Sequence, residues 1–137
     1  MLQTTTQSLA GLPAFFAYFA LALVLSVIFI RIYTWLTPHD EFGLIRQNNN
    51  AAAVAFGGAL IGFALPLASA ITHSLSLLDC AIWGGVALLV QALTFVLLRL
   101  LLNNLPKRIE QGEMASASLV AASAIAVGLI NSACMSY

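Results

Sequence analysis

The chain has 137 residues, of which 61% are hydrophobic and 7% are charged, and its formal net charge is zero. A soluble domain carries roughly 25% charged residues, so this chain cannot cover its surface with polar groups and is predicted to be an integral membrane protein. A neutral chain also gives no reason to expect nucleic acid as a partner.

Four long segments are nearly free of acidic and basic residues: roughly 9–36, 50–73, 79–102 and 114–137. Each is long enough, because about 20 apolar residues span the hydrocarbon as a helix. The alternating segments of about 10 residues that build a membrane β-barrel are not seen. Backbone groups in lipid must be satisfied within the segment. We therefore predict an all-α membrane protein with four transmembrane helices in a single membrane domain, residues 1–137.

The chain begins with MLQTTTQSLAGLPAFF, which has no basic residue before the apolar run. No small-residue cleavage site followed by a polar mature sequence comes after it. We therefore expect this segment to be retained as the first helix.

The stretch TPHDEFGLIRQNNN after the first segment gathers Asp40, Glu41 and Arg46. Thr37 to Asp40 has the form of a capping box, with Thr37 as the N-cap, and predicts a short interfacial helix that begins at Pro38. One of the three asparagines at 48–50 would then cap the second transmembrane helix.

The second and fourth segments carry small residues at a spacing of four, which places them on one helix face. Such faces let helices approach closely in lipid, so we expect these two helices at the centre, within a monomer or between protomers. The alternative is that Ala and Gly are merely common in membrane helices. Pro66 is expected to kink the second helix and free the carbonyl of Gly62. The predicted packing residues are Ala51, Ala55, Gly58, Gly62, Ala124, Gly128 and Ser132.

Two amide side chains lie within the third and fourth segments. Gln91 is near the middle of the third, and Asn131 is in the outer half of the fourth. Interhelical amide hydrogen bonding is the favoured interpretation for both, with a substrate contact as the alternative. Cys80 and Cys134 are expected at the same outer end, where they are a disulfide or, the favoured interpretation, two free thiols.

The basic residues all flank the loops after the first and third helices. The positive-inside rule places these two loops in the cytoplasm and both termini outside. Arg31 and Arg99 lie within the helix ends, so each must snorkel to lipid phosphate or find a partner. Acidic residues nearby suggest two charge clusters at the cytoplasmic side: Arg31, Asp40, Glu41 and Arg46, and then Arg99, Lys107, Arg108, Glu110 and Glu113.

A weak internal repeat runs through the chain. RIYTWLTP (31–38) aligns with RLLLNNLP (99–106), and AAAVAFGGALIG (51–62) aligns with ASASLVAASAIA (115–126). We predict two joined helical hairpins, at about 9–73 and 79–137. Each hairpin has an even number of spans, so the repeats are parallel rather than inverted.

No nucleophile, base and orienting group stand at a recognisable spacing, and metal-type or phosphate-binding motifs are absent from the sequence. We therefore expect no enzyme activity and no cofactor. The favoured function is a self-associating interaction module that presents charged cytoplasmic loops to a protein partner or to membrane lipid. The alternative is a subunit of an oligomeric channel or small transporter, with Arg31, Arg99, Gln91 and Asn131 lining the pore.

Three stretches, TPHDEFGLIRQNNNAAAVAFGGALIGFALPLASA, AIWGGVALLVQ and INSACM, resemble the YjfL family of bacterial inner-membrane proteins. The resemblance covers nearly the whole chain. It implies a multi-pass protein of the bacterial inner membrane, with four helices built from a duplicated hairpin and no characterised molecular function. The genes of that family often neighbour envelope-stress genes, which implies a partner-binding role in envelope stress.

Overall fold

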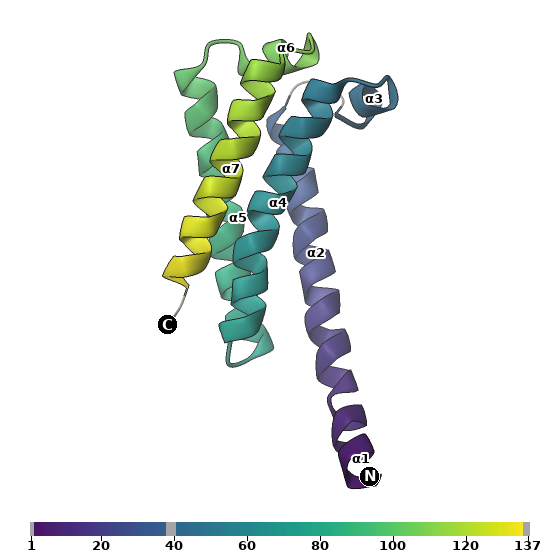
Figure 1. Cartoon of the computed structure of the whole chain (residues 1–137). Helices are drawn as coiled ribbons and strands as arrows, with labels where there is room; N and C mark the ends of the chain where they lie inside the picture. Colours follow the sequence, from purple (N-terminus) through teal and green to yellow (C-terminus); the bar gives the residue numbers. More distant parts are fainter. Residues whose placement is uncertain (1, 38–40, 136–137) are drawn as a thin grey trace.

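The computed structural model describes residues 2–37 and 41–135, and its regular elements are all helices. Four spans, Leu2–Leu36, Asn50–His73, Leu77–Leu101 and Met114–Cys134, are long and apolar enough to cross a membrane. The prediction of an all-α protein with four membrane helices is confirmed. In chain order the helices are α1 (Leu2–Ala10), α2 (Leu12–Leu36), α3 (Glu41–Arg46), α4 (Asn50–His73), α5 (Leu77–Leu101), α6 (Leu105–Glu110) and α7 (Met114–Cys134) (Figure 1).

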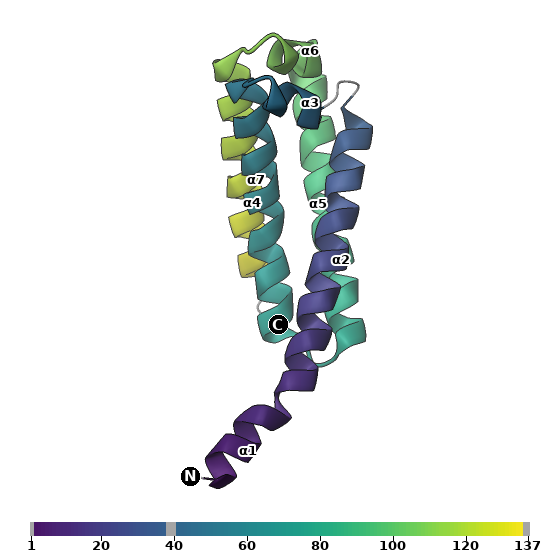
Figure 2. The same cartoon turned by 90° about the vertical axis from the view of Figure 1, so that its right-hand side faces the viewer.

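The helical region at the N-terminus begins earlier than the apolar pattern predicted. α1 is polar, with the sequence LQTTTQSLA, and none of its residues is buried. Gly11 separates it from α2, and Pro13 in the first turn of α2 has no N–H to continue the ladder of the preceding turn. α1 therefore projects beyond the bundle at an angle to α2 (Figure 2).

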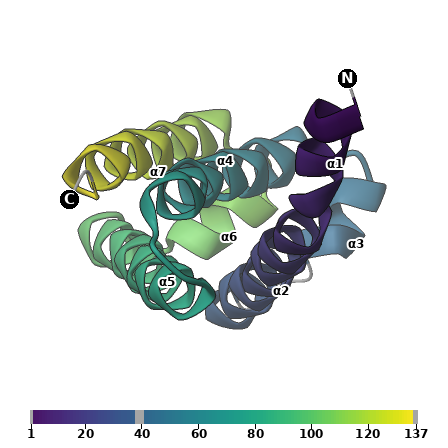
Figure 3. The ribbon, with the colours of Figure 1, turned by 90° about the horizontal axis from the view of Figure 1, so that it is seen from below.

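The four long helices form a bundle in which α4 and α5 each contact the other three (Figure 3). The closest pairing is between α4 and α7. The small residues predicted for packing lie at this contact, where Ala51, Ala55, Gly58 and Gly62 of α4 are buried. Ala124 and Gly128 of α7 are buried opposite them.

The α4–α7 contact brings backbone against backbone. A Cβ added at Gly58 would overlap the Cα and Cβ of Ala121, and one at Gly62 would overlap the backbone carbonyl of Ala124. A Cβ added at Gly128 would meet the carbonyl of Gly62. Backbone atoms cannot rotate away as a side chain can, so these glycines are required at the positions where the two helices cross.

A layer of aromatic rings joins α2 to the rest of the bundle. Phe29 stacks on Phe63 of α4 with ring centroids 4.8 Å apart. Tyr33 meets Phe95 of α5 and Phe56 of α4 edge-on, at 5.3 Å and 5.4 Å. Offset and edge-on pairs are favoured by the ring quadrupole. Large side chains therefore fill the space between α2 and its neighbours, unlike the α4–α7 contact.

The two short helices, α3 and α6, are six residues each and are followed by the same backbone geometry. Asn48 and Gly112, which stand 64 positions apart, both have a positive φ, of 68° and 84°. The next residue in each case, Asn49 or Glu113, is the N-cap of the following long helix. The backbone hydrogen bonds match at the same offset of 64 residues. The N–H of Asn48 donates to the carbonyl of Ile45, as that of Gly112 donates to Ile109. The N–H of Asn49 donates to the carbonyl of Leu44, as that of Glu113 donates to Arg108.

The predicted capping box at 37–40 is wrong in its first residue. Thr37 is the C-cap of α2, and its hydroxyl donates back to the carbonyls of Tyr33 and Thr34. Thr37 therefore closes α2 and does not open α3. α3 begins at Glu41, and the predicted start at Pro38 and the N3 position Asp40 lie outside the described residues.

Candidate functional site

The connections that contain α3 and α6 lie at the same end of the bundle (Figure 1). We call this the charged end and define it as residues 31–50 and 99–114. By sequence position it holds all five basic residues and every acidic residue except Asp79. Asp79 lies at the opposite end, where its carboxylate accepts from the backbone N–H of Leu75 at the start of α5.

Asn49 ties the two connections of the charged end together. Its side-chain oxygen accepts from the N–H of Ala52, which caps α4. Its amide nitrogen donates to the carbonyl of Glu110 at 2.9 Å and to that of Ile109 at 3.5 Å, at the last turn of α6. One side chain therefore provides hydrogen-bond partners for a free backbone N–H at the start of α4 and for free backbone carbonyls at the end of α6. The connections 41–50 and 102–114 are held as one surface.

A polar groove of about 420 Å³ lies across this joint. Exposed Gln47, Asn48, Asn50 and Gln111 line it, and we call it the amide groove. Amide side chains both donate and accept hydrogen bonds, so such a lining suits a polypeptide backbone or another polar group. The remaining lining residues are Leu44, Asn49, Ala51, Glu110, Gly112 and Met114.

Around the groove, the charges pair differently from the prediction. Arg99 does not pair with Glu110 or Glu113. Its guanidinium donates instead to the carbonyl of Leu36, at the end of α2, at 2.8 Å. Glu113 pairs with Arg108, with the nitrogen and oxygen 3.9 Å apart, and accepts from Ser116. Arg99 therefore anchors α5 to the end of α2, which carries a favourable partial negative charge.

Arg31 and Glu41, which the sequence offered as one alternative pair, lie in different environments. Glu41 is buried, with 1% of its surface exposed, whereas Arg31 is exposed on the outward face of α2. Asp40, the other predicted partner of Arg31, lies outside the described residues. Arg46 on α3 and Lys107 on α6 are exposed cations of the charged end.

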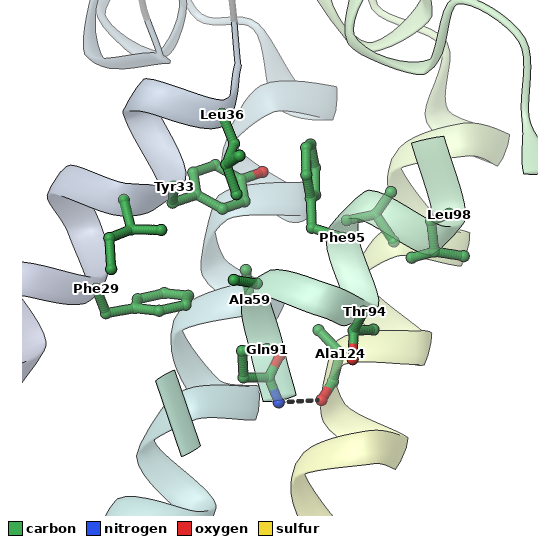
Figure 4. Close-up of a pocket in the computed structure, with 12 residues that line it drawn as sticks. Phe29, Tyr33, Leu36, Ala59, Gln91, Thr94, Phe95, Leu98 and Ala124 are labelled. Carbon is green, nitrogen blue, oxygen red and sulfur yellow. Dashed lines mark hydrogen bonds between the residues drawn. The ribbon is translucent and has the colours of Figure 1, made fainter. Parts of the chain in front are cut away.

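Gln91 is a buried polar centre near the middle of the bundle. Its amide nitrogen donates to the carbonyl of Gly62 at 2.9 Å and to that of Ala124 at 3.2 Å, so it joins α5 to both α4 and α7. Figure 4 shows the bond to Ala124. Pro66 follows Gly62 by four residues and has no N–H to offer its carbonyl. Gln91 thus supplies the donor that the proline removes.

The cavity beside Gln91 is small. Its volume is about 20 Å³, and Phe29, Tyr33 and Phe95 are among the residues that close it (Figure 4). A cavity of that size holds about one water molecule.

The remaining predicted residues, Asn131, Ser132, Cys80 and Cys134, lie away from the charged end. The amide nitrogen of Asn131 is buried and has no hydrogen-bond partner among the described residues. The backbone carbonyl of Ser132 accepts from Ser69 of α4 at 3.1 Å. Cys80 is buried and Cys134 is exposed, and both are free thiols. No group of three His, Cys, Asp or Glu side chains in the described part of the chain could hold a metal ion.

Sequence reasoning missed the joint made by Asn49 and the groove around it. The three consecutive asparagines were a signal, because only one of them is needed as a helix cap. Which one turns toward α6 depends on the left-handed backbone at Asn48. That conformation is set by the packing of the two connections.

The fold and its charged end define a small α-helical membrane protein that crosses the bilayer several times. The chain belongs to the family described as Domain of Unknown Function (DUF350), whose model matches residues 7–135. The UPF0719 inner membrane protein YjfL of Escherichia coli, in strain K12 and in O157:H7, is 40% identical over 129 residues, which cover 94% of this chain and 98% of that protein. The UPF0719 transmembrane protein YshE of Bacillus subtilis is 31% identical over 68 residues, about half of each chain.

No solved structure matches this chain. The resemblance to the YjfL family is confirmed by these relatives, one of which is an inner membrane protein by name.

Proposed function

We propose that the protein is a multi-pass protein of the bacterial inner membrane that presents its charged end to the cytoplasm as a docking surface for a protein partner. The inner-membrane location follows from the name of the E. coli relative. The cytoplasmic orientation of the charged end, with both termini outside, follows from the positive-inside rule, because no basic residue lies at the other end.

The observation that carries this proposal is the Asn49 joint. Its hydrogen bonds to Ala52 and to the carbonyl of Glu110 fix two connections from different halves of the chain. A fixed polar groove binds a partner at a smaller entropic cost than two independent loops. The exposed cations Arg46 and Lys107 of the charged end would steer an acidic segment of the partner toward this surface.

Two joined hairpins of parallel orientation form part of the same proposal. The equal lengths of α3 and α6 and their matched capping geometry, 64 positions apart, support a duplication. The duplicated connections then face the same side of the membrane. The amide groove lies where they meet, so the docking surface needs both halves of the chain.

Self-association is also proposed, but it must use a surface other than the small-residue faces. Those faces are buried between α4 and α7 of one chain. The outward face of α2 remains available, with Phe15, Phe16 and Phe19 exposed. Native mass spectrometry in nanodiscs would report the copy number. A monomer at every protein concentration would remove self-association from the proposal.

An oligomeric channel is less well supported. Gln91, predicted to line the pore, is 4% exposed and has its amide nitrogen bonded to two backbone carbonyls. Arg99 is bonded to the end of α2. The absence of enzyme activity and of a cofactor stays a prediction.

Orientation can be tested by cysteine labelling in intact cells and in cells with a permeabilised inner membrane. The background would be Cys134→Ser, since Cys134 is the exposed native thiol. Gln47→Cys in the amide groove should react with a membrane-impermeant maleimide only after permeabilisation. Leu75→Cys, at 93% exposure in the opposite connection, should react before it. The reverse pattern would place the docking surface outside the cytoplasm.

Docking itself can be tested by site-specific photo-crosslinking in cells. A photoreactive residue at Gln111 in the groove should give a discrete protein adduct, which mass spectrometry identifies. The same residue at Leu75 is the matched control for general proximity. Arg46→Glu with Lys107→Glu should abolish the adduct without changing the amount of protein in the membrane. An adduct that persists in this double variant would contradict the proposal.

A further inference from the structure

The outward face of α2 near the charged end carries an arginine that the bundle does not use. Arg31 is exposed and stands five residues before the end of the helix at Leu36. That is about 8 Å inside the end at 1.5 Å per residue. No carboxylate forms an ion pair with Arg31 in the part of the chain that the structure describes. Arg99 and Arg108 each have a partner within the chain, whereas Arg46 is exposed on α3.

The surroundings of Arg31 combine one cation with an aromatic residue. Trp35 lies one turn later on the same face and is 83% exposed. Arg31, Ile32, Thr34 and Trp35 line an open groove of about 490 Å³. The Thr34 hydroxyl already donates to the carbonyl of Arg31, so the groove offers the guanidinium and the indole N–H as its free donors.

The position of this groove decides what can fill it. α2 is part of a candidate membrane span, and its outward face is not covered by another helix of the chain. A charged side chain at that depth is costly unless it meets an anion at the interface. Tryptophan is enriched at the same level, where its ring is apolar on one side and its N–H is met by polar groups. The anion present at this depth is the phosphodiester of a membrane lipid.

We propose that Arg31 and Trp35 form a binding site for the phosphate of an anionic glycerophospholipid. The planar guanidinium of Arg31 donates two parallel N–H groups to the phosphate oxygens. The Trp35 ring packs against the glycerol and the upper part of the acyl chain. A zwitterionic headgroup is a weaker ligand, because its own ammonium offsets the charge that Arg31 recognises. This site depends on the insertion of α2 in a membrane and is independent of the docking function.

The second tryptophan of the chain gives a direct test. The chain has two tryptophans, so Trp83→Phe leaves Trp35 as the only indole. Brominated lipids quench indole fluorescence on contact. The bilayers would be phosphatidylcholine mixed with brominated phosphatidylglycerol. We expect Trp35 to be quenched more than the share of brominated lipid in the bilayer would give. The excess should correspond to a roughly fivefold preference of the site for phosphatidylglycerol over phosphatidylcholine.

Three variants separate the charge of Arg31 from other causes. Arg31→Gln should reduce the preference to about one, and Arg31→Lys should retain part of it because the charge stays and the bidentate geometry is lost. Arg108→Gln, on α6, should leave the preference unchanged. Arg31 is exposed, so all three proteins are expected to fold, and circular dichroism would verify this.

Two results would overturn the site. The first is equal quenching by the two brominated lipids in the parent. The second is a preference that Arg31→Gln leaves intact. Loss of the quenching on addition of excess inorganic phosphate would also overturn it, because the ligand would then be a free anion rather than a lipid headgroup. The orientation and crosslinking experiments on the amide groove do not enter this test, so either proposal can fail alone.

Discussion

The α4–α7 contact and the contact of α2 with the bundle achieve helix packing in opposite ways. Between α4 and α7, glycine and alanine bring the backbones together, and Gly58, Gly62 and Gly128 leave no room for a Cβ. Between α2 and its neighbours, Phe29 and Tyr33 fill the space with rings. Of the 25 residues of α2, only Leu25, Phe29 and Tyr33 are buried, whereas α4 buries a nearly continuous face.

The difference shows which contact can adjust. In lipid there is no hydrophobic driving force between helices, so close packing and interhelical hydrogen bonds must hold them together. A backbone contact has one geometry, whereas aromatic side chains change rotamer to accommodate a shift. We therefore expect α4 and α7 to behave as a rigid unit and α2 to be more tolerant of substitution.

The largest effect is expected from a bulky side chain in the rigid unit. Gly62→Leu places atoms where the backbone of Ala124 lies, so the helices must separate. Overpacking of this kind costs about 3 kcal/mol or more. Gly57→Leu is the matched control, because a Cβ there meets nothing within 4 Å. Unfolding in SDS, followed by circular dichroism, would compare them. Equal stability of the two variants would show that the α4–α7 contact is not the rigid centre.

The features that could be predicted from the sequence are those that depend on one helix alone. The spacing of four at Gly58 and Gly62 and the missing donor at Pro66 are properties of one helix, and both could be identified in the sequence. The sequence predicted that Gln91 forms an interhelical hydrogen bond, but not that it donates to the carbonyl left free by Pro66. Which carbonyls it reaches follows from the crossing point of three helices.

The errors concern residues whose direction depends on tertiary contacts. Thr37 could cap the helix it ends or the one that follows, and its sequence context fits both. Glu41 and Arg31 are close in the chain, but the rotation of α2 turns Arg31 outward while α3 turns Glu41 inward. The polar helix α1 was not predicted, because the helices were predicted from runs of apolar residues and α1 has none.

Loss of the Gln91 donor should have the next largest effect on the same centre. Gln91→Leu keeps the volume and leaves the carbonyl of Gly62 without a donor, because Pro66 cannot supply one. Interhelical hydrogen bonds in membranes contribute roughly 0.6–1.7 kcal/mol, and we expect a loss near the upper value. Leu93→Ala, on an exposed position of the same helix, is the control. Unchanged SDS unfolding in Gln91→Leu would mean that water replaces the amide.

A smaller effect is expected at the charged end. Asn49→Ala removes the cap of α4 and the bonds to α6, which should cost about 1 kcal/mol. Asn50→Ala, one residue further and exposed, should cost less than about 0.5 kcal/mol. Hydrogen exchange would locate the difference in 41–50 and 102–114. Equal exchange in the two variants would show that the Asn49 joint does not hold these connections together.

The smallest effect is expected where the chain is least packed. Removal of residues 2–10 deletes α1, which buries none of its residues and is followed by the break at Gly11 and Pro13. The unfolding free energy should therefore change by less than about 0.5 kcal/mol. Phe29→Ala in α2 is the contrasting variant, because it removes a ring that stacks on Phe63 and should be clearly less stable. If the deletion instead lowers stability or reduces the copy number in nanodiscs, α1 contacts another copy of the chain, and the tolerant side of the molecule is also its self-association surface.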